Sequence, residues 1–220
     1  SRKGNCLHCV LSTLSISFCY VSHHTHNQPG ENKRTTMAST TNETNPLDRK
    51  WCIFEHKNWK AYTKLATFDS VENFWGYWDQ MPLPSTFFYN GQAKGSIAGR
   101  EVEAFSIFEH GIEPTWEDPQ NLGGAMVCFK TEKVKLEALD TFWENLALAL
   151  ISGDHRLSKI LCGIRVADKS KSGKYKSPTV TKLELWLRTA CDEDPGMQAE
   201  LKELFESCLS DGSGRSAGDG

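Results

Sequence analysis

The pair Trp116–Glu117 is the strongest candidate for chemistry in this chain of 220 residues, seven of which are tryptophan. It lies in the string Gly111-Ile112-Glu113-Pro114-Thr115-Trp116-Glu117-Asp118, where an acidic residue directly follows an indole in a Pro-bounded loop. An indole offers a flat π face and a carboxylate accepts hydrogen bonds. The pair therefore suits a planar, positively charged ligand that carries N–H donors.

A second tryptophan, Trp186, is predicted to lie on an open face of a sheet. In the run 182–187, three leucines alternate with Lys182, Glu184 and Trp186. Alternate side chains of a strand point to opposite faces. Because the leucines must cover the helices, we expect an exposed Trp186 on the helix-free face, beside a lysine and a glutamate.

Basic residues are predicted to surround Trp186. In the preceding strand Arg165 and Lys169 fall on the face opposite Ile164 and Val166. If the two strands form a hairpin, Arg165 and Lys169 join Lys182 and the lysines of the connection in one patch: Lys171, Lys174 and Lys176. A basic patch beside an indole suits a nucleotide, whereas a lysine run alone is more often a solvated loop.

Hydrophobic periodicity predicts the elements that hold these residues. Strands are expected at 51–56, 61–68, 103–108, 125–131, 159–167 and 180–188, and helices at about 70–81, 136–151 and 195–209. Helices scattered among hairpin-like strands favour an α+β fold, in which helices cover one face of an antiparallel sheet.

The folded domain is expected at residues 45–210. Residues 1–44 are rich in Ser, Thr, Asn and His, and the first methionine is Met37, so we expect this segment to be disordered or foreign to the native protein. Residues 211–220 are small and polar and indicate a flexible tail. Cys6-Leu7-His8-Cys9 resembles half of a zinc site, but the later histidines lack the usual spacing, so no metal is expected.

Composition limits the possible partners. The net charge is −3, so contacts with phosphate must come from a local basic cluster. Eight cysteines, several within apolar runs, indicate reduced, buried thiols in a cytoplasmic or nuclear protein. Because no apolar stretch reaches the roughly 20 residues that span a bilayer, no membrane partner is expected.

Ordered motifs between about residues 45 and 209 resemble the eukaryotic translation initiation factor 4E family of messenger RNA cap-binding proteins. They are Asn45-Pro46-Leu47 before Trp51, Trp59, the run 68–75 (FDSVENFW), the run 111–118 followed by Gly123-Gly124, Phe142-Trp143, Cys162-Gly163 and Lys182-Leu183-Glu184-Leu185-Trp186. The resemblance implies a curved antiparallel sheet with three helices on its convex face and the ligand, a 7-methylguanosine cap, on its concave face.

The resemblance also implies residue roles. Trp59 and Trp116 would sandwich the methylated base, Glu117 would accept hydrogen bonds from guanine N1 and N2, and Trp186 would touch the N7 methyl group. Lys182, with Lys169 or Arg165, would hold the phosphates. Methylation at N7 makes the purine cationic, so two indole faces gain a cation–π attraction in addition to stacking. No cofactor is implied.

On the convex face the family receives a helix from a 4G-like scaffold or a 4E-binding repressor protein. The corresponding residues are Pro46, Leu47, Val71 and Trp75. Val71 and Trp75 are four residues apart and so lie on one stripe of a helix. The alternative is that Trp75 is a core residue.

Three departures from the family pattern alter these expectations. Glu144 stands where many relatives carry an apolar residue of the partner groove, and Ala125-Met126 replaces a frequent basic residue and tryptophan. The last strands of relatives have no counterpart after residue 209, so we expect about six strands, a less covered sheet edge and weaker cap affinity.

Several functional alternatives remain open. An enzyme is disfavoured because the sequence has no Gly-rich phosphate loop and no nucleophile beside a base. A carbohydrate-binding module would need neither Glu117 nor the basic patch. Two cap-binding roles remain close rivals: an initiation factor that recruits a scaffold, and a translational repressor. Either would be cytoplasmic, with a nuclear pool as a further possibility.

Overall fold

The structure, a computed structural model, describes residues 6–11, 14–20, 44–58, 60–132, 136–153, 156–170, 180–189 and 194–209. Trp59, Lys171, Lys174 and Lys176 lie outside these ranges, as does the predicted tail 211–220.

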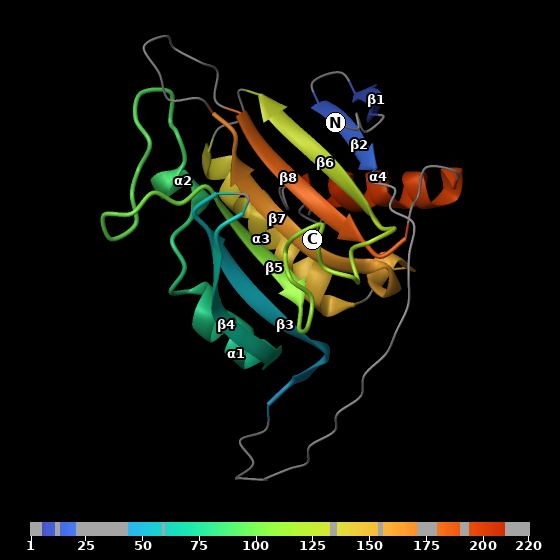
Figure 1. Ribbon diagram of the computed structural model, residues 1–220, viewed down its shortest axis with the longest axis horizontal. Helices are drawn as coiled ribbons and strands as arrows, with labels where there is room; N and C mark the ends of the chain where they lie inside the picture. The colour runs from blue at the N-terminus through green and yellow to red at the C-terminus, as the bar shows by residue number, and fades with distance from the viewer. Residues whose placement is uncertain are drawn as a thin grey trace, which may run out of the picture.

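The described strands form one antiparallel sheet of eight strands in the order β1-β2-β6-β8-β7-β5-β3-β4 (Figure 1). The strands are β1 Cys6–Leu11, β2 Leu14–Tyr20, β3 Pro46–His56, β4 Tyr62–Ser70, β5 Ala104–Glu109, β6 Ala125–Glu132, β7 Leu161–Asp168 and β8 Val180–Leu187. The last six correspond to the six predicted strands, and the predicted hairpin between the Arg165 and Trp186 strands is confirmed by the pairing of β7 with β8.

Two strands differ from the expectation. β1 and β2 lie in the segment that we expected to be disordered, and β2 pairs with β6 over Ser15–Tyr20 and Ala125–Lys130. The first part of that expectation, disorder, is therefore wrong for residues 6–11 and 14–20, while its alternative, a segment foreign to the native protein, stays a prediction. The expectation of a poorly covered edge is also wrong at β6, because β2 satisfies the backbone groups that an edge strand would leave unpaired.

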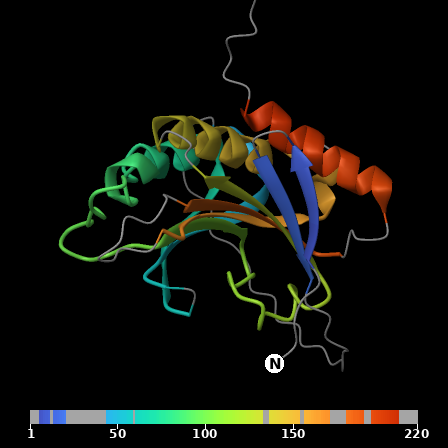
Figure 2. The ribbon, with the colours of Figure 1, turned by 90° about the horizontal axis from the view of Figure 1, so that it is seen from above.

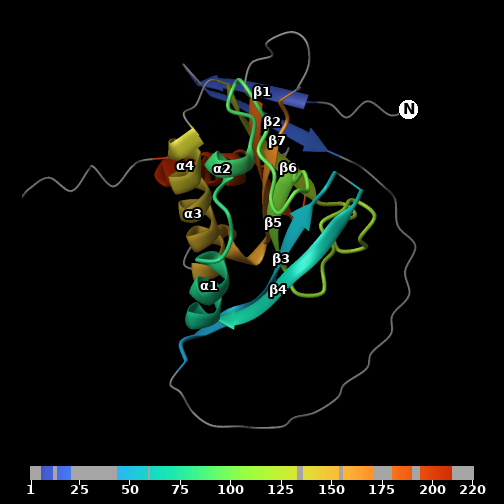
Figure 3. The ribbon, with the colours of Figure 1, turned by 90° about the vertical axis from the view of Figure 1, so that its left-hand side faces the viewer.

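The three predicted helices are present on one face of the sheet. They are α1 Val71–Trp78, α3 Leu136–Ser152 and α4 Pro195–Leu209, accompanied by the single-turn helices α2 Pro84–Phe87 and η1 Arg156–Lys159. Seen from above, the helices form a layer over the curved sheet, while the β3–β4 turn and the β5–β6 connection project from the opposite side (Figure 2). The side view shows the same two layers (Figure 3). These findings confirm the α+β fold.

Local sequence explains where α1 begins. The side chain of Ser70 accepts a hydrogen bond from the backbone N–H of Asn73 at 3.3 Å, which caps the helix. Phe74 and Trp78, four residues apart, are buried against the sheet. The helix ends at Trp78, and Pro82 soon after prevents it from continuing.

The main core lies between the sheet and the helices. Leu183, Leu185 and Leu187 belong to it, together with Ile164 and Val166, as strand alternation predicted. A second apolar cluster covers the helix-free face. We call it the front cluster, and its buried members are Cys52, Phe54, Phe108, Ile112, Met126, Cys128, Cys162 and Trp186.

Candidate functional site

The β5–β6 connection, residues 110–124, presents Trp116 and Glu117 on the helix-free side of the sheet. Two buried polar side chains give this connection its shape. The Asp118 carboxylate accepts the backbone N–H groups of Glu113 and Gln120, both at 2.7 Å. The Asn121 amide donates to the carbonyl oxygens of Glu113 at 2.9 Å and Thr115 at 2.7 Å. The backbone on both sides of Trp116 is therefore fixed by side chains that sequence reasoning did not assign to the site.

Two adjacent glycines allow the connection to rejoin the sheet. Gly123 adopts a positive φ of 80°, which favours glycine. A Cβ atom at Gly124 would collide with the backbone carbonyl oxygen of Leu187 on β8. The Gly-Gly pair thus lets the chain turn and enter β6 in close contact with the strand that carries Trp186.

Trp116 lies on top of Trp186. Their ring centroids are 4.3 Å apart with an angle of 33° between the planes. Trp116 is half-buried, whereas Trp186 is only 1% exposed. The expectation of an exposed Trp186 is wrong: the face was predicted correctly, but Trp116 covers the ring and Glu184 accepts its indole N–H at 3.1 Å.

Two further described residues belong to the candidate site: Glu117, and Tyr62 at the start of β4. Glu117 is exposed, and among the described residues it makes no hydrogen bond or ion pair, so its carboxylate is open to a ligand. Tyr62, three residues after Trp59, packs on the front cluster as Trp116 does. Burial and a hydrogen bond with Glu113 raise the pKa of Tyr62 to about 12. These contacts connect the strand after the β3–β4 turn to the Trp116 connection.

The predicted phosphate-binding residues have a different environment from the one expected. Arg165 and Lys182 both form ion pairs with Glu184, at 2.5 Å and 3.0 Å. Only Lys169 is exposed. The expected basic patch is therefore partly neutralised at Arg165 and Lys182, because the carboxylate of Glu184, on the same face, contacts both side chains; their role in holding phosphate stays a prediction.

A buried histidine adjoins this cluster. His56, 1% exposed at the end of β3, shares a hydrogen bond with Ser106 at 2.7 Å. Burial, reinforced by the charge of Arg165, lowers the pKa of His56 to about 3, so the imidazole is neutral. A shallow hollow beside it is lined by Asn58, Glu103, Arg165 and Lys169. Strand alternation could have placed His56 on this face with Phe54, but not its contact with Ser106, 50 residues away in the sequence.

The four residues predicted to bind a protein partner come together on the opposite side. Pro46 pairs with Ser70 at the start of α1, and Asn45 accepts the backbone N–H of Val71 at 3.0 Å. Pro46 is exposed, while Leu47, Val71 and Trp75 are half-buried. Trp75 and Leu47 also touch the main core, so Trp75 is partly a core residue and partly accessible.

Glu144 of α3 contacts α1, the helix that carries Val71 and Trp75. Its carboxylate accepts the indole N–H of Trp78 at 3.1 Å. The departure from the family pattern therefore has a structural role, since it satisfies a buried donor of α1.

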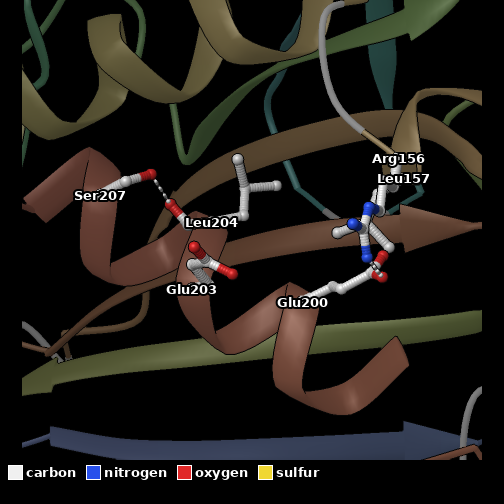
Figure 4. Close-up of a pocket in the computed structure, with 6 residues that line it drawn as sticks. All are labelled: Arg156, Leu157, Glu200, Glu203, Leu204 and Ser207. Carbon is white, nitrogen blue, oxygen red and sulfur yellow. Dashed lines mark hydrogen bonds and ion pairs between the residues drawn. The ribbon is translucent and has the colours of Figure 1, made fainter. Parts of the chain in front are cut away.

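Other parts of the described chain offer weaker candidates. A hollow between η1 and α4 is lined by Arg156, Leu157, Glu200, Glu203, Leu204 and Ser207, and the guanidinium of Arg156 points to Glu200 (Figure 4). It contains no aromatic platform.

Among the described residues, no group of histidine, cysteine or acidic side chains could hold a metal, and no helix is long and apolar enough to cross a membrane. Four described cysteines, Cys52, Cys128, Cys162 and Cys208, are buried free thiols.

Comparison with known proteins decides the family. A sequence model of eukaryotic initiation factor 4E matches residues 31–213. Eukaryotic translation initiation factor isoform 4E of Capsicum annuum is 30% identical over 185 residues, which cover 79% of this chain and 80% of that protein. The protein of the same description from Solanum lycopersicum is 31% identical over 187 residues, covering 79% and 82%. The chain belongs to the eukaryotic initiation factor 4E family.

Solved structures show the same fold. The complex of C. elegans eIF4E-3 with the 4E-binding protein Mextli matches with a TM-score of 0.57 at 22% identity, covering 76% of this chain and 87% of that one. The complex of Ascaris suum eIF4E-3 with m7G cap matches with a TM-score of 0.56 at 23% identity, covering 76% and 84%. Membership of this family places the chain among translation initiation factors and not among enzymes.

Proposed function

We propose that this protein binds the 7-methylguanosine cap of messenger RNA on the helix-free face and a 4E-binding segment of a scaffold or repressor on the α1 side. Its place of action is the cytoplasm, where capped messages are translated. Ascaris suum eIF4E-3, whose fold it shares, was solved with m7G cap. The observation that carries the proposal is the Trp116–Glu117 pair, a half-buried indole beside an exposed carboxylate on a loop fixed by Asp118 and Asn121.

Base recognition follows from these two side chains together with Trp59. Trp116 stacks on one face of the base and Trp59, from the β3–β4 turn, on the other. Glu117 accepts the N1 and N2 donors of guanine, which adenine cannot supply because its N1 is an acceptor. Stacking is worth about 1–3 kcal/mol per base, and the positive charge of the methylated purine adds a cation–π attraction from each indole.

Ligand entry requires Trp116 to move. In the structure its ring packs on Trp186 at a centroid distance of 4.3 Å, so a base cannot reach Trp186 while this contact persists. Lifting Trp116 exposes Trp186 at the floor of the site, where it can meet the N7 methyl group. The contact between the indoles therefore represents a closed form, and cap binding exchanges it for two indole–base contacts.

The partner site is built from Pro46, Leu47, Val71 and Trp75. An amphipathic helix from the partner can bury the accessible part of Trp75 and the exposed ring of Pro46. C. elegans eIF4E-3, which shares the fold, was solved with the 4E-binding protein Mextli.

Retention on immobilised 7-methyl-GTP tests cap binding. We expect the protein to be retained, eluted by free 7-methyl-GTP and not eluted by GTP at the same concentration. Glu117→Gln should lose most of the retention, because a neutral amide no longer makes charge-assisted bonds. Glu101→Gln, at another exposed position, should be retained normally. Elution by GTP as effective as elution by 7-methyl-GTP would contradict the proposal.

Partner binding has its own test. Trp75→Ala should abolish capture by a synthetic 4E-binding helix while retention on 7-methyl-GTP persists. Tyr77→Ala changes an exposed aromatic residue of the same helix, 40% exposed, and serves as the control. Loss of both activities in Trp75→Ala would mean that this residue acts only in the core.

A further inference from the structure

Glu184 is a buried carboxylate in the middle of the proposed phosphate site. It lies on β8, opposite Arg165 of β7 and Cys128 of β6, and is 1% exposed. A charged group so deeply buried persists only when partners compensate for the loss of water. Its position on the face that carries Trp186 makes it part of the site and not of the main core.

Three side chains hold the Glu184 carboxylate. One oxygen accepts the Arg165 Nε–H at 2.6 Å and the Trp186 indole N–H at 3.1 Å, while the other forms the ion pair with Lys182 at 3.0 Å. The Arg165 guanidinium also lies 5.3 Å from the ring centroid of Trp186. Burial alone would raise the pKa of Glu184, but the charges of Arg165 and Lys182 outweigh it and lower the pKa, so the group is ionised.

The charge balance of the site follows from these contacts. The site has three cations. Arg165 and Lys182 are both in direct contact with Glu184, which offsets one of their two positive charges, whereas Lys169 is exposed. The side chains of Arg165 and Lys182 are 12% and 16% exposed, so little of either cation faces solvent. Glu184 already uses some of the N–H donors of Arg165 and Lys182, and its charge repels a phosphate that approaches them.

We propose that Glu184 is a specificity-determining residue that makes recognition depend on the methylated base and only weakly on the number of phosphates. The substrate class is then 7-methylguanine nucleotides with short as well as long phosphate chains. Glu184 has a second effect at the same position, because its hydrogen bond to the indole N–H fixes Trp186 beneath the base. The inference rests on the proposed cap-binding function.

Fluorescence titration of the full chain with 7-methyl-GMP, 7-methyl-GDP and 7-methyl-GTP at fixed ionic strength tests this role. For the wild type we expect the triphosphate to bind at most about ten-fold more tightly than the monophosphate, because Glu184 offsets one of the three cations and only Lys169 is exposed. Glu184→Gln should raise that ratio by about five-fold or more, since the amide keeps the shape of the side chain and removes its negative charge. The slope of log affinity for 7-methyl-GTP against log salt should also steepen.

Glu55→Gln is the matched control. Glu55 is also a strand carboxylate paired with an arginine, Arg100 at 2.8 Å, but its neighbours do not include Trp186. Its triphosphate to monophosphate ratio should equal that of the wild type. Should Glu184→Gln not fold, the wild-type ratio decides the question.

The outcomes distinguish a failure of the proposed role of Glu184 from a failure of the proposed cap binding. An unchanged ratio in a Glu184→Gln protein that still binds 7-methyl-GMP would overturn the role of Glu184 and leave cap binding intact. A wild-type preference for the triphosphate of about a hundred-fold or more would do the same. Failure of the wild type to bind any of the three nucleotides would instead overturn the proposed function, and this inference with it.

Discussion

Lowering the pH should destabilise the fold through His56. The imidazole is 1% exposed and its pKa is lowered to about 3 by burial and by Arg165, whereas an unfolded chain has a histidine pKa of about 6.5. Between these values the unfolded state binds a proton that the folded state does not. Stability is therefore full above pH 6.5 and falls as the pH decreases toward 3.

The size of the effect follows from the two pKa values. Between pH 7 and pH 5 the folded His56 stays neutral while the unfolded one becomes almost fully protonated. At 1.36 kcal/mol per unit of pH below 6.5, the free energy of unfolding should decrease by about 2 kcal/mol over this interval from His56 alone. The chain has seven histidines, so a variant is needed to isolate the effect of this one.

Urea unfolding at pH 7 and pH 5 is the assay, with tryptophan fluorescence as the signal. His56→Gln, whose amide can still reach Ser106, should lose about 2 kcal/mol less than the wild type over the same interval. His110→Gln, at an exposed position, should follow the wild type. If the wild type and His56→Gln lost stability equally, the argument for a buried neutral imidazole would be refuted.

Three further predictions concern the residues that shape the site. Asn121→Ala should lower the free energy of unfolding by about 2 kcal/mol, because the carbonyls of Glu113 and Thr115 lose their donor. It should also weaken 7-methyl-GTP binding. Unchanged affinity would show that the loop holds its shape without Asn121. Gly124→Ala should destabilise the fold by about 2 kcal/mol, because the added Cβ collides with the backbone of Leu187. Gly76→Ala, at a position in α1 with open space, should stabilise the fold by about 0.5–1 kcal/mol. Equal effects of the two variants in urea unfolding would contradict the close approach of Gly124 to Leu187. Glu144→Leu should lower the free energy of unfolding by about 1 kcal/mol, because the Trp78 indole N–H loses its acceptor; a more stable variant in the same assay would argue against that bond.

Strand alternation predicted which face each residue of β8 occupies. Leu183, Leu185 and Leu187 lie in the main core, and Trp186 lies on the other face, because period-two patterning follows directly from backbone geometry. The same rule placed Lys182, Glu184 and Arg165 together. The six strands from residue 46 onward and the three long helices were likewise accessible from periodicity and capping.

Strand alternation does not predict how exposed a side chain is, or which charges and strands pair. Trp186 is buried because Trp116, 70 residues earlier, folds over it, and sequence alone does not fix how a loop ring packs. The charge of the patch depends on the register that sets Glu184 opposite Arg165. The pairing of β2 with β6 was not predicted either. Residues 14–20 do alternate apolar with small residues, but they lie in a segment whose richness in Ser, Thr, Asn and His indicated disorder.

The central claim is that indole faces hold a cationic purine while Glu117 reads its edge. Titration of intrinsic tryptophan fluorescence with 7-methyl-GTP and with GTP tests it most directly, using the wild type and Trp116→Leu. Two cation–π contacts of about 1 kcal/mol each predict roughly thirty-fold tighter binding of 7-methyl-GTP by the wild type, and a reduced preference in the variant. Equal affinities for the two nucleotides, or an unchanged preference in Trp116→Leu, would contradict the account.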